Sequence, residues 1–167
     1  MAFSILRPAL SIILGIGIFT SHANAFDQAN VHTLEQTNSC YRCDLSGADL
    51  AGWDLSGAEL WESQLVGANL SNADLSRANL AKADLGGAVL VDAELTAAML
   101  NGANLIGANL SGADLKGADL GSVDLLEADL TDANLYQANI PRFARWETAV
   151  LCRTTMPNGN VENSGCP

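Results

Sequence analysis

Four cysteines are the residues of this sequence whose type and spacing could do chemistry. Two form the motif Cys40-x-x-Cys43, and two lie near the C-terminus at Cys152 and Cys166. Cys-x-x-Cys is a spacing found in zinc ligands and in redox-active thiol pairs. An even number of cysteines also suits a disulfide framework in an oxidising compartment. The interpretation of these residues therefore depends on whether the protein is exported.

The N-terminal segment 1–25 has the order of a secretory signal. Arg7 is followed by an apolar stretch at 9–19 and by the small-residue motif Ala-Asn-Ala at 23–25. The apolar stretch is shorter than the roughly 20 residues that a transmembrane helix needs. We therefore predict cleavage after Ala25 and export to the periplasm, the cell exterior or a thylakoid lumen, with an uncleaved membrane tether as the alternative.

The charge balance argues against two classes of partner. The chain has 19 acidic and 8 basic residues and a net charge of −11. Removal of residues 1–25 takes away Arg7 and no acid, so the exported chain would carry −12. A surface this acidic repels nucleic-acid phosphates and anionic membranes. We therefore expect no nucleic acid as a partner, and no membrane contact apart from the leader.

The sequence offers little histidine from which to build a catalytic site. Outside the predicted leader the sequence has only His32, so a nucleophile and histidine pair would depend on that one residue. We interpret His32 as an exposed residue of the N-terminal flank. Acidic residues are abundant, but they recur at one repeated position, which is no evidence for a general acid and base pair. We expect no enzymatic activity, no catalytic residue and no cofactor.

A period of five organises the sequence from Cys43 to Ile140. Leu occupies every fifth position from Leu45 to Leu135, and Ile140 closes a series of 20 units. We call these positions centres. The residue two before a centre is usually Ala, and the residue one before is mostly Asp or Asn. Neither a strand period of 2 nor a helix period of 3.6 keeps every centre on one side, whereas a chain that turns a corner once in each unit does.

The tandem pattern A-(D/N)-L-x-x resembles that of the pentapeptide-repeat family, over the whole chain between leader and tail. In that family four pentapeptides form one square coil, so the resemblance implies an all-β, right-handed quadrilateral β-helix of about five to six coils. The family geometry points the centre and the Ala two before it inward, which leaves no cavity for a substrate. The predicted organisation is signal 1–25, flank 26–39, β-helix 40–156 and tail 157–167.

Both ends of the predicted rod depart from the repeat. Trp53 stands at an inward Ala position that cannot accommodate it in a regular coil, so we interpret it as part of an N-terminal plug. After Ile140 the register slips by one position near Pro141. The repeat then resumes with three further centres, Trp146, Leu151 and Met156. We therefore expect a sixth coil to begin before the tail.

The implied rod places the two pairs of cysteines at opposite ends. At the spacing of hydrogen-bonded strands, about 4.8 Å per coil, five coils give a length of about 25 Å. A disulfide needs Cα atoms within about 7 Å, so Cys40–Cys43 and Cys152–Cys166 are the pairings that remain. The same separation argues against a zinc site made of all four. A redox-active Cys40–Cys43 pair is the remaining alternative, although no cation cluster is evident to lower a thiol pKa.

A step of four pentapeptides also stacks acidic side chains on one face. The column comprises Asp54, Asp74, Glu94 and Asp114, followed by Asn134. Like charges on neighbouring strands are unfavourable, and Arg77 and Lys116 on the same face could offset part of the repulsion. A divalent cation could offset more, which makes the column a weak candidate metal site. A solvated acidic face is the simpler interpretation.

A second column is the most apolar outward line of the predicted rod. It contains Ser46, Val66, Gly86, Ile106 and Leu126, with Val89 near it on the neighbouring face. We call Val66, Ile106 and Leu126 the apolar stripe, because exposed aliphatic side chains in a row tend to be covered. The flank 26–39 could cover it through Val31 and Leu34. The alternative is a weak, transient contact with a second copy or another exported protein.

These observations favour a non-enzymatic structural or protein-interaction solenoid in an exported compartment. One alternative comes from family members that resemble duplex DNA and bind DNA gyrase. The acidic rod fits that role, whereas the export leader does not. Another alternative is a cation-binding acidic scaffold built on the column from Asp54 to Asp114.

Overall fold

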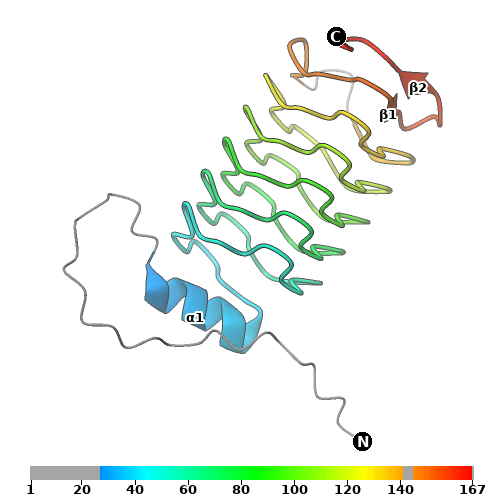
Figure 1. Cartoon of the computed structure of the whole chain (residues 1–167). Coiled ribbons are helices and arrows are strands. Elements are labelled where there is room, and N and C mark those ends of the chain that lie inside the picture. The colour runs from blue at the N-terminus through cyan, green and yellow to red at the C-terminus, as the bar shows by residue number, and fades with distance from the viewer. Residues whose placement is uncertain (1–26, 141–144, 167) are drawn as a thin grey trace, which may run out of the picture.

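The computed structural model describes residues 27–140 and 145–166, and the predicted leader lies outside them. The chain winds into a rod of stacked coils with a helix at one end and a short hairpin at the other (Figure 1). Helix α1 spans Gln28–Thr37, and the antiparallel strands β1 and β2 span Thr154–Thr155 and Val161–Glu162. Within the described ranges, no helix is long and apolar enough to cross a membrane.

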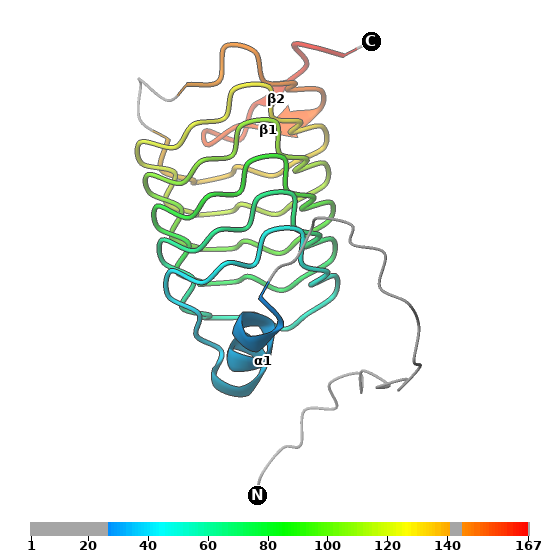
Figure 2. The same cartoon turned by 90° about the vertical axis from the view of Figure 1, so that its left-hand side faces the viewer.

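Parallel β-bridges join each coil to the next, as the stacked ribbons of Figure 2 show. From Ser39↔Glu59 to Asp119↔Asn139 the bridged positions are always four pentapeptides apart. Backbone N–H groups donate to carbonyl groups of the neighbouring coil with the same repeat. For example, Leu50 N donates to Asn69 O at 2.8 Å. Beyond this region the step becomes one position longer, beginning with Asp124↔Arg145. The longer step agrees with the register slip expected near Pro141.

The interior of the rod consists of the Leu centres and the Ala residues two positions before them. Each centre from Leu45 to Leu135 is at most 1% exposed. Burial of a Leu side chain contributes about 2 kcal/mol, so the ladder of centres is the main source of stability. Ser63 replaces one inward Ala, and its hydroxyl donates to Leu60 O at 2.6 Å, which satisfies the buried oxygen.

The recurrent Asp or Asn before a centre stabilises the corner that follows that centre. Its side-chain oxygen accepts a hydrogen bond from the backbone N–H two positions later, as in Asp84 Oδ1 with Gly86 N at 3.1 Å and Asn109 Oδ1 with Ser111 N at 3.0 Å. This is an Asx turn, which short carboxylate and amide side chains form readily. The residue after this N–H donor is left-handed and forms the corner, as at Lys82 with φ 56°. A square coil therefore follows from a turn repeated in every pentapeptide.

The N-terminal flank contains helix α1, which the all-β prediction lacked. Asp27 caps the helix by accepting from Ala29 N at 2.9 Å, and the left-handed Asn38 ends it. Leu34 joins the core of the rod, and Val31 packs against it. Figures 1 and 2 show α1 lying across the N-terminal end of the stack. The interpretation that these residues cover the apolar stripe was wrong, because they cover the end of the rod.

Trp53 differs from the sequence interpretation in its backbone. Its side chain is partly buried against the core. Its backbone keeps the hydrogen bonds of a regular coil, since Trp53 N donates to Leu50 O and Asp74 N donates to Trp53 O at 2.9 Å. The expectation that a Trp cannot fit a regular coil was therefore wrong for the backbone. The side chain is accommodated near the rod's end, where less of the interior is enclosed.

The C-terminal end is closed by the tail. Leu151 N donates to Ser164 O at 2.9 Å, and Met156 N donates to Asn160 O at 2.7 Å, so the tail replaces the carbonyls of a further coil. The three centres of this last coil stay partly exposed. They are Trp146, Leu151 and Met156.

Candidate functional site

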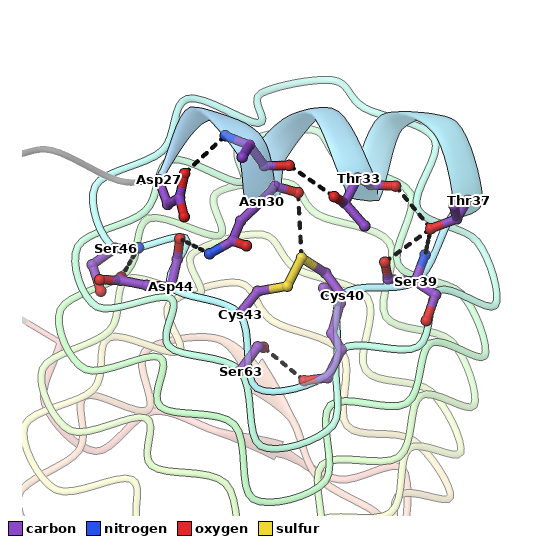
Figure 3. Close-up of a disulfide and its surroundings, with 12 residues drawn as sticks. Asp27, Asn30, Thr33, Thr37, Ser39, Cys40, Cys43, Asp44, Ser46 and Ser63 are labelled. Atoms are coloured by element: carbon purple, nitrogen blue, oxygen red, sulfur yellow. Dashed lines mark hydrogen bonds between the residues drawn. A yellow bond between two sulfur atoms is a disulfide. The ribbon is translucent and has the colours of Figure 1, made fainter.

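The structure joins Cys40 to Cys43, with Cα atoms 5.3 Å apart. Cys40 occupies the position of a centre, one pentapeptide before Leu45, and is buried. Figure 3 shows the disulfide directly beneath α1, where Cys40 Sγ lies 3.3 Å from the carbonyl oxygen of Asn30. The amide of Asn30 also donates to Asp44 O at 3.3 Å. A sulfur held between helix and first coil fits a structural bond better than a redox-active pair.

The second disulfide joins Cys152 to Cys166 and closes the other end. Its Cα atoms lie 4.7 Å apart, and Cys152 is buried. Both pairings are those predicted from the sequence, and neither spans the rod. No described cysteine is free. The four cysteines therefore do not converge on one site.

The acidic column stacks as the sequence predicts, through the bridges Asp54↔Asp74, Asp74↔Glu94 and Glu94↔Asp114. Neighbouring hydroxyls occupy the carboxylates, because Ser76 Oγ donates to Asp74 and Thr96 Oγ1 donates to Glu94. Asp114 Oδ1 accepts from Lys116 N and from the amide of Asn134, each at 3.0 Å. Across residues 27–140 and 145–166, no three His, Cys, Asp or Glu side chains form a group that could hold a metal ion.

Amide groups separate the carboxylates on the other faces. On the face opposite the acidic column, Asn104 Nδ2 donates to Asp84 Oδ1 at 2.8 Å. Asn69 and Asn139 likewise donate to Asp49 and Asp119 on two further faces. A donor between two carboxylates removes part of their repulsion. The acidic column is therefore the column with the most consecutive carboxylates.

His32 lies on α1 and is exposed, with Nδ1 3.8 Å from Glu35 Oε2. A hydroxyl or thiol nucleophile would have to reach this residue on the outer surface of the helix. The arrangement supports no catalytic role for His32, and it matches the interpretation of an exposed flank histidine.

The apolar stripe is open to solvent. Val66 is 43% exposed and Ile106 is 39% exposed, while Leu126 is partly buried. The stripe runs along the face centred on Leu65, Leu85 and Leu105, which we call the stripe face. Because α1 lies at the end of the rod, none of the flank that the structure describes covers this face.

An aromatic and charged cluster near the N-terminal end was not predicted as a unit. The rings of Tyr41 and Trp61 stack with centroids 4.8 Å apart. Arg42 lies over Tyr41, and Lys82 lies 5.8 Å from the centre of the Trp61 ring. Glu62 sits between the two cations, at 2.7 Å from Arg42 and 3.6 Å from Lys82. Comparing positions one coil apart would have revealed both the aromatic pair and the alternating charges.

The ion pairs of the two ends shift carboxyl pKa values in the same direction. The hydrogen bond from Arg42 lowers the pKa of Glu62, and the charge of Lys82 adds to the effect. The hydrogen bond from Arg153 lowers the pKa of Asp132 in the last coil. Arg153 Nε lies 2.6 Å from Asp132 Oδ1. Glu62 is partly buried and Asp132 is exposed, and both pairs lie on the surface of the rod.

The repeated coil, the Leu core and the Asx corners together define a solenoid class. The family model of pentapeptide repeats matches eight copies, at residues 43–80, 73–112 and 108–143. The chain belongs to the pentapeptide-repeat family. Members fold as right-handed quadrilateral β-helices, which confirms the predicted fold class apart from α1. Proteins of this family are generally structural or interaction proteins and not enzymes.

Solved structures of the same family resemble this chain. The pentapeptide repeat protein Rfr23 from the cyanobacterium Cyanothece 51142 is 31% identical, with a TM-score of 0.50, and the match covers 73% of this chain and 89% of that one. A pentapeptide repeat protein from the Arabidopsis thaliana thylakoid lumen is 30% identical over 70% of each chain, with a TM-score of 0.31. QnrB1, a plasmid-mediated fluoroquinolone resistance protein, is 19% identical over 76% of this chain and 78% of that one, with a TM-score of 0.30. No curated protein matches the sequence.

Proposed function

We propose that this chain is a non-enzymatic protein-interaction solenoid of an exported compartment, and that the apolar stripe is its partner surface. One observation carries the proposal. The rod has a filled core, yet Val66 and Ile106 stand exposed in one column of an otherwise polar face. Exposed aliphatic side chains in a row are a feature of interaction surfaces. The partner is another exported protein, bound through a weak, transient contact.

Export is supported by the sequence of residues 1–25 and by the two disulfides, which persist in oxidising compartments. Expression of the full chain followed by fractionation and N-terminal sequencing tests export. Cleavage after Ala25 in the exported fraction is expected. Retention of the intact chain in the cytoplasm would contradict this part of the proposal.

The partner surface is tested by chemical cross-linking of the exported chain, followed by mass spectrometry. Replacing Ile106 and Leu126 together by Ser should leave the melting curve unchanged and abolish the cross-linked partner. A matched control replaces Met99 and Tyr136 by Ser, since these side chains are 42% and 40% exposed on other faces. Equal cross-linking in both double variants would show that the stripe is ordinary surface.

Two assays separate this proposal from the alternatives. A gyrase supercoiling assay with the exported chain tests the DNA-mimic role, and inhibition or protection of gyrase would favour it. Calorimetry with calcium and with magnesium tests the acidic column from Asp54 to Asp114. Heat of binding that is lost in Asp74→Asn would favour a cation-binding scaffold, and the interaction proposal expects none.

A further inference from the structure

The edge beside the stripe face carries no side chains over four consecutive coils. It consists of the corner residues Gly47, Gly67, Gly87 and Gly107, which we call the glycine edge. Each of the other three corners carries side chains in at least two of the same coils. Examples are Glu62 and Lys82 at one corner, Asn72 and Asp92 at another, and Arg77 and Ala97 at the third.

The coil itself does not require glycine along this edge. The corner conformation is left-handed, which favours glycine, but Asp92 adopts it with φ 54° and Ala97 with φ 57° in the same rod. A Cβ atom built on Gly67, Gly87 or Gly107 would meet nothing within 4 Å. The left-handed conformation is common to all four corners and packing leaves this edge open, so neither singles out this edge for glycine in four successive coils.

Aliphatic side chains lie beside the glycine edge on the stripe face. Val66 and Ile106 stand on the stripe face, whereas on the next face the partly buried Val89 shares its column with the polar residues Asp49, Asn69 and Asn109. Within the stripe, Gly86 leaves a gap between Val66 and Ile106. A Cβ at Gly86 would approach Asp84 Oδ1 to 3.3 Å and Asn104 Nδ2 to 3.5 Å. The result is a bare edge beside the apolar stripe, which allows another main chain to approach closely.

The charge of the stripe face selects the kind of partner. Its outward positions from 44 to 126 include Asp44, Asp84 and Asp124 and no Lys or Arg. Arg145 of the following coil pairs with Asp124 at 2.6 Å and leaves the other two without a cation on this face. A second copy would bring the same carboxylates and a net charge near −12 against them. Charge complementarity therefore favours a cationic partner over a second copy.

We propose that the glycine edge and the apolar stripe together bind an extended, cationic segment of another exported protein. Its main chain lies along Gly67, Gly87 and Gly107, its aliphatic side chains contact Val66 and Ile106, and its Lys or Arg side chains face Asp84. This proposal deepens the proposed function and rests on it. A single strip of this size stays below the roughly 1,200 Å² of stable complexes, so the affinity is modest.

The test is fluorescence anisotropy with a labelled octapeptide of alternating Val and Lys, titrated with the exported chain. A peptide with Glu in place of Lys is the charge control. The double variant Gly87→Gln with Gly107→Gln places side chains along the edge. Glu127, one coil further along the same edge, has φ 60° and shows that this corner accepts a side chain of that length. The matched control is Gly57→Gln with Gly117→Gln, at a corner whose glycines are also left-handed and have open space for a Cβ.

We expect the Val–Lys peptide to bind and the Val–Glu peptide not to bind. Filling the glycine edge should weaken binding about tenfold, which corresponds to about 1.4 kcal/mol. The control pair should leave the affinity unchanged, and both double variants should melt at the same temperature. Absence of binding by the Val–Lys peptide, equal binding by the Val–Glu peptide, or equal loss in the two variants would overturn the proposal.

Cross-linking separates this inference from the proposed function. If the natural partner is lost in Ile106→Ser with Leu126→Ser but retained when the glycine edge is filled, the interaction function stands and the mode of docking is wrong. Sedimentation velocity tests whether a second copy occupies the edge. Concentration-dependent dimers of the exported chain that disappear when the edge is filled would identify a second copy as the occupant and overturn the cationic partner.

Discussion

The two ends of the rod solve the same problem by different means. A solenoid end exposes core side chains and unpaired backbone groups, which must be covered. At the N-terminal end, helix α1 places the buried Leu34 on the core, and a disulfide with a sequence separation of 3 fixes the first corner. At the C-terminal end, a tail with a short hairpin is fixed by a disulfide with a separation of 14.

The difference shows in how much core each end leaves exposed. Leu34 is 1% exposed, whereas Leu151 of the last coil is only partly buried. Helix α1 packs Val31 and Leu34 against the end of the rod, while the tail supplies mainly backbone hydrogen bonds. The N-terminal end is therefore sealed by packing, and the C-terminal end is closed mainly by hydrogen bonds and a covalent bond.

The largest expected effect is the loss of stability when a buried Leu is replaced by Ala, and three Leu residues are compared. Replacing mid-rod Leu90 by Ala should destabilise the protein by about 2–5 kcal/mol, the range for emptying a packed core site. Leu34→Ala should cost as much if α1 is a true part of the core. Leu151→Ala should cost only about 1–2 kcal/mol, because its side chain is already partly exposed. Chemical denaturation measures all three.

Outward Asp84 provides the control for this series. Asp84→Ala removes surface hydrogen bonds and should cost about 1 kcal/mol or less. A cost for Leu34→Ala as small as that of Asp84→Ala would show that α1 does not seal the end. Equal costs for Leu90→Ala and Asp84→Ala would contradict the inward assignment of the centres.

The next effect concerns the two disulfides. Replacing Cys152 and Cys166 by Ser should destabilise the protein by about 3 kcal/mol, since the bond closes a long loop of the unfolded chain. Replacing Cys40 and Cys43 by Ser should cost about 2 kcal/mol, because the loop is much shorter. Thermal unfolding of the oxidised protein compares the two variants. A larger loss at the N-terminal pair would mean that its role in seating α1 exceeds its effect on the unfolded chain.

The pairing itself is checked by mass spectrometry of a non-reduced digest of the exported protein. We expect one peptide linking Cys40 to Cys43 and another linking Cys152 to Cys166. A peptide that links Cys40 to Cys152 cannot come from a folded rod. Its recovery, or the recovery of four free thiols from exported material, would show that the ends are not covalently fixed as described.

The smallest expected effect is on pH dependence. Glu62 and Asp132 have folded pKa values lowered from 4.5 and 3.8 by their Arg partners. A lowered folded pKa stabilises the fold above the unfolded value, and this contribution is lost as the pH falls through the folded pKa. The melting temperature should therefore drop as the pH falls below about 4. Glu62→Gln should flatten this profile more than Asp132→Asn, because Glu62 contacts two cations. Identical profiles for the two variants would show that Lys82 contributes nothing.

The sequence was sufficient to predict the coil because the same pentapeptide rule is repeated many times. Each Leu centre and each Ala two before it carries the same information, and the structure buries them as predicted. Helix α1 lies outside the repeat and occurs once, so no repetition reinforces its signal. Its indications in the sequence were Asp27, a residue type that caps helices, Asn38, a residue type that ends them, and the spacing of Val31 and Leu34.

The surface columns could be predicted only in part, for a related reason. A step of one coil correctly aligned Asp54, Asp74 and Glu94. It did not show that Ser76 and Thr96, from the neighbouring column, donate to these carboxylates. The glycine edge required a further comparison, because its absence of side chains is informative only when the other corners are known to accept them.

The constant step of four pentapeptides between bridged positions has a consequence for how this protein can evolve. A coil in the middle of the rod receives and offers the same backbone hydrogen bonds as its neighbours. A gene duplication or deletion of the codons for one whole coil there would lengthen or shorten the rod and leave every remaining register intact. A block that does not encode a whole number of pentapeptides would turn buried centres outward. We therefore expect related rods to differ in length by whole coils, while the helix and the tail stay fixed at the ends.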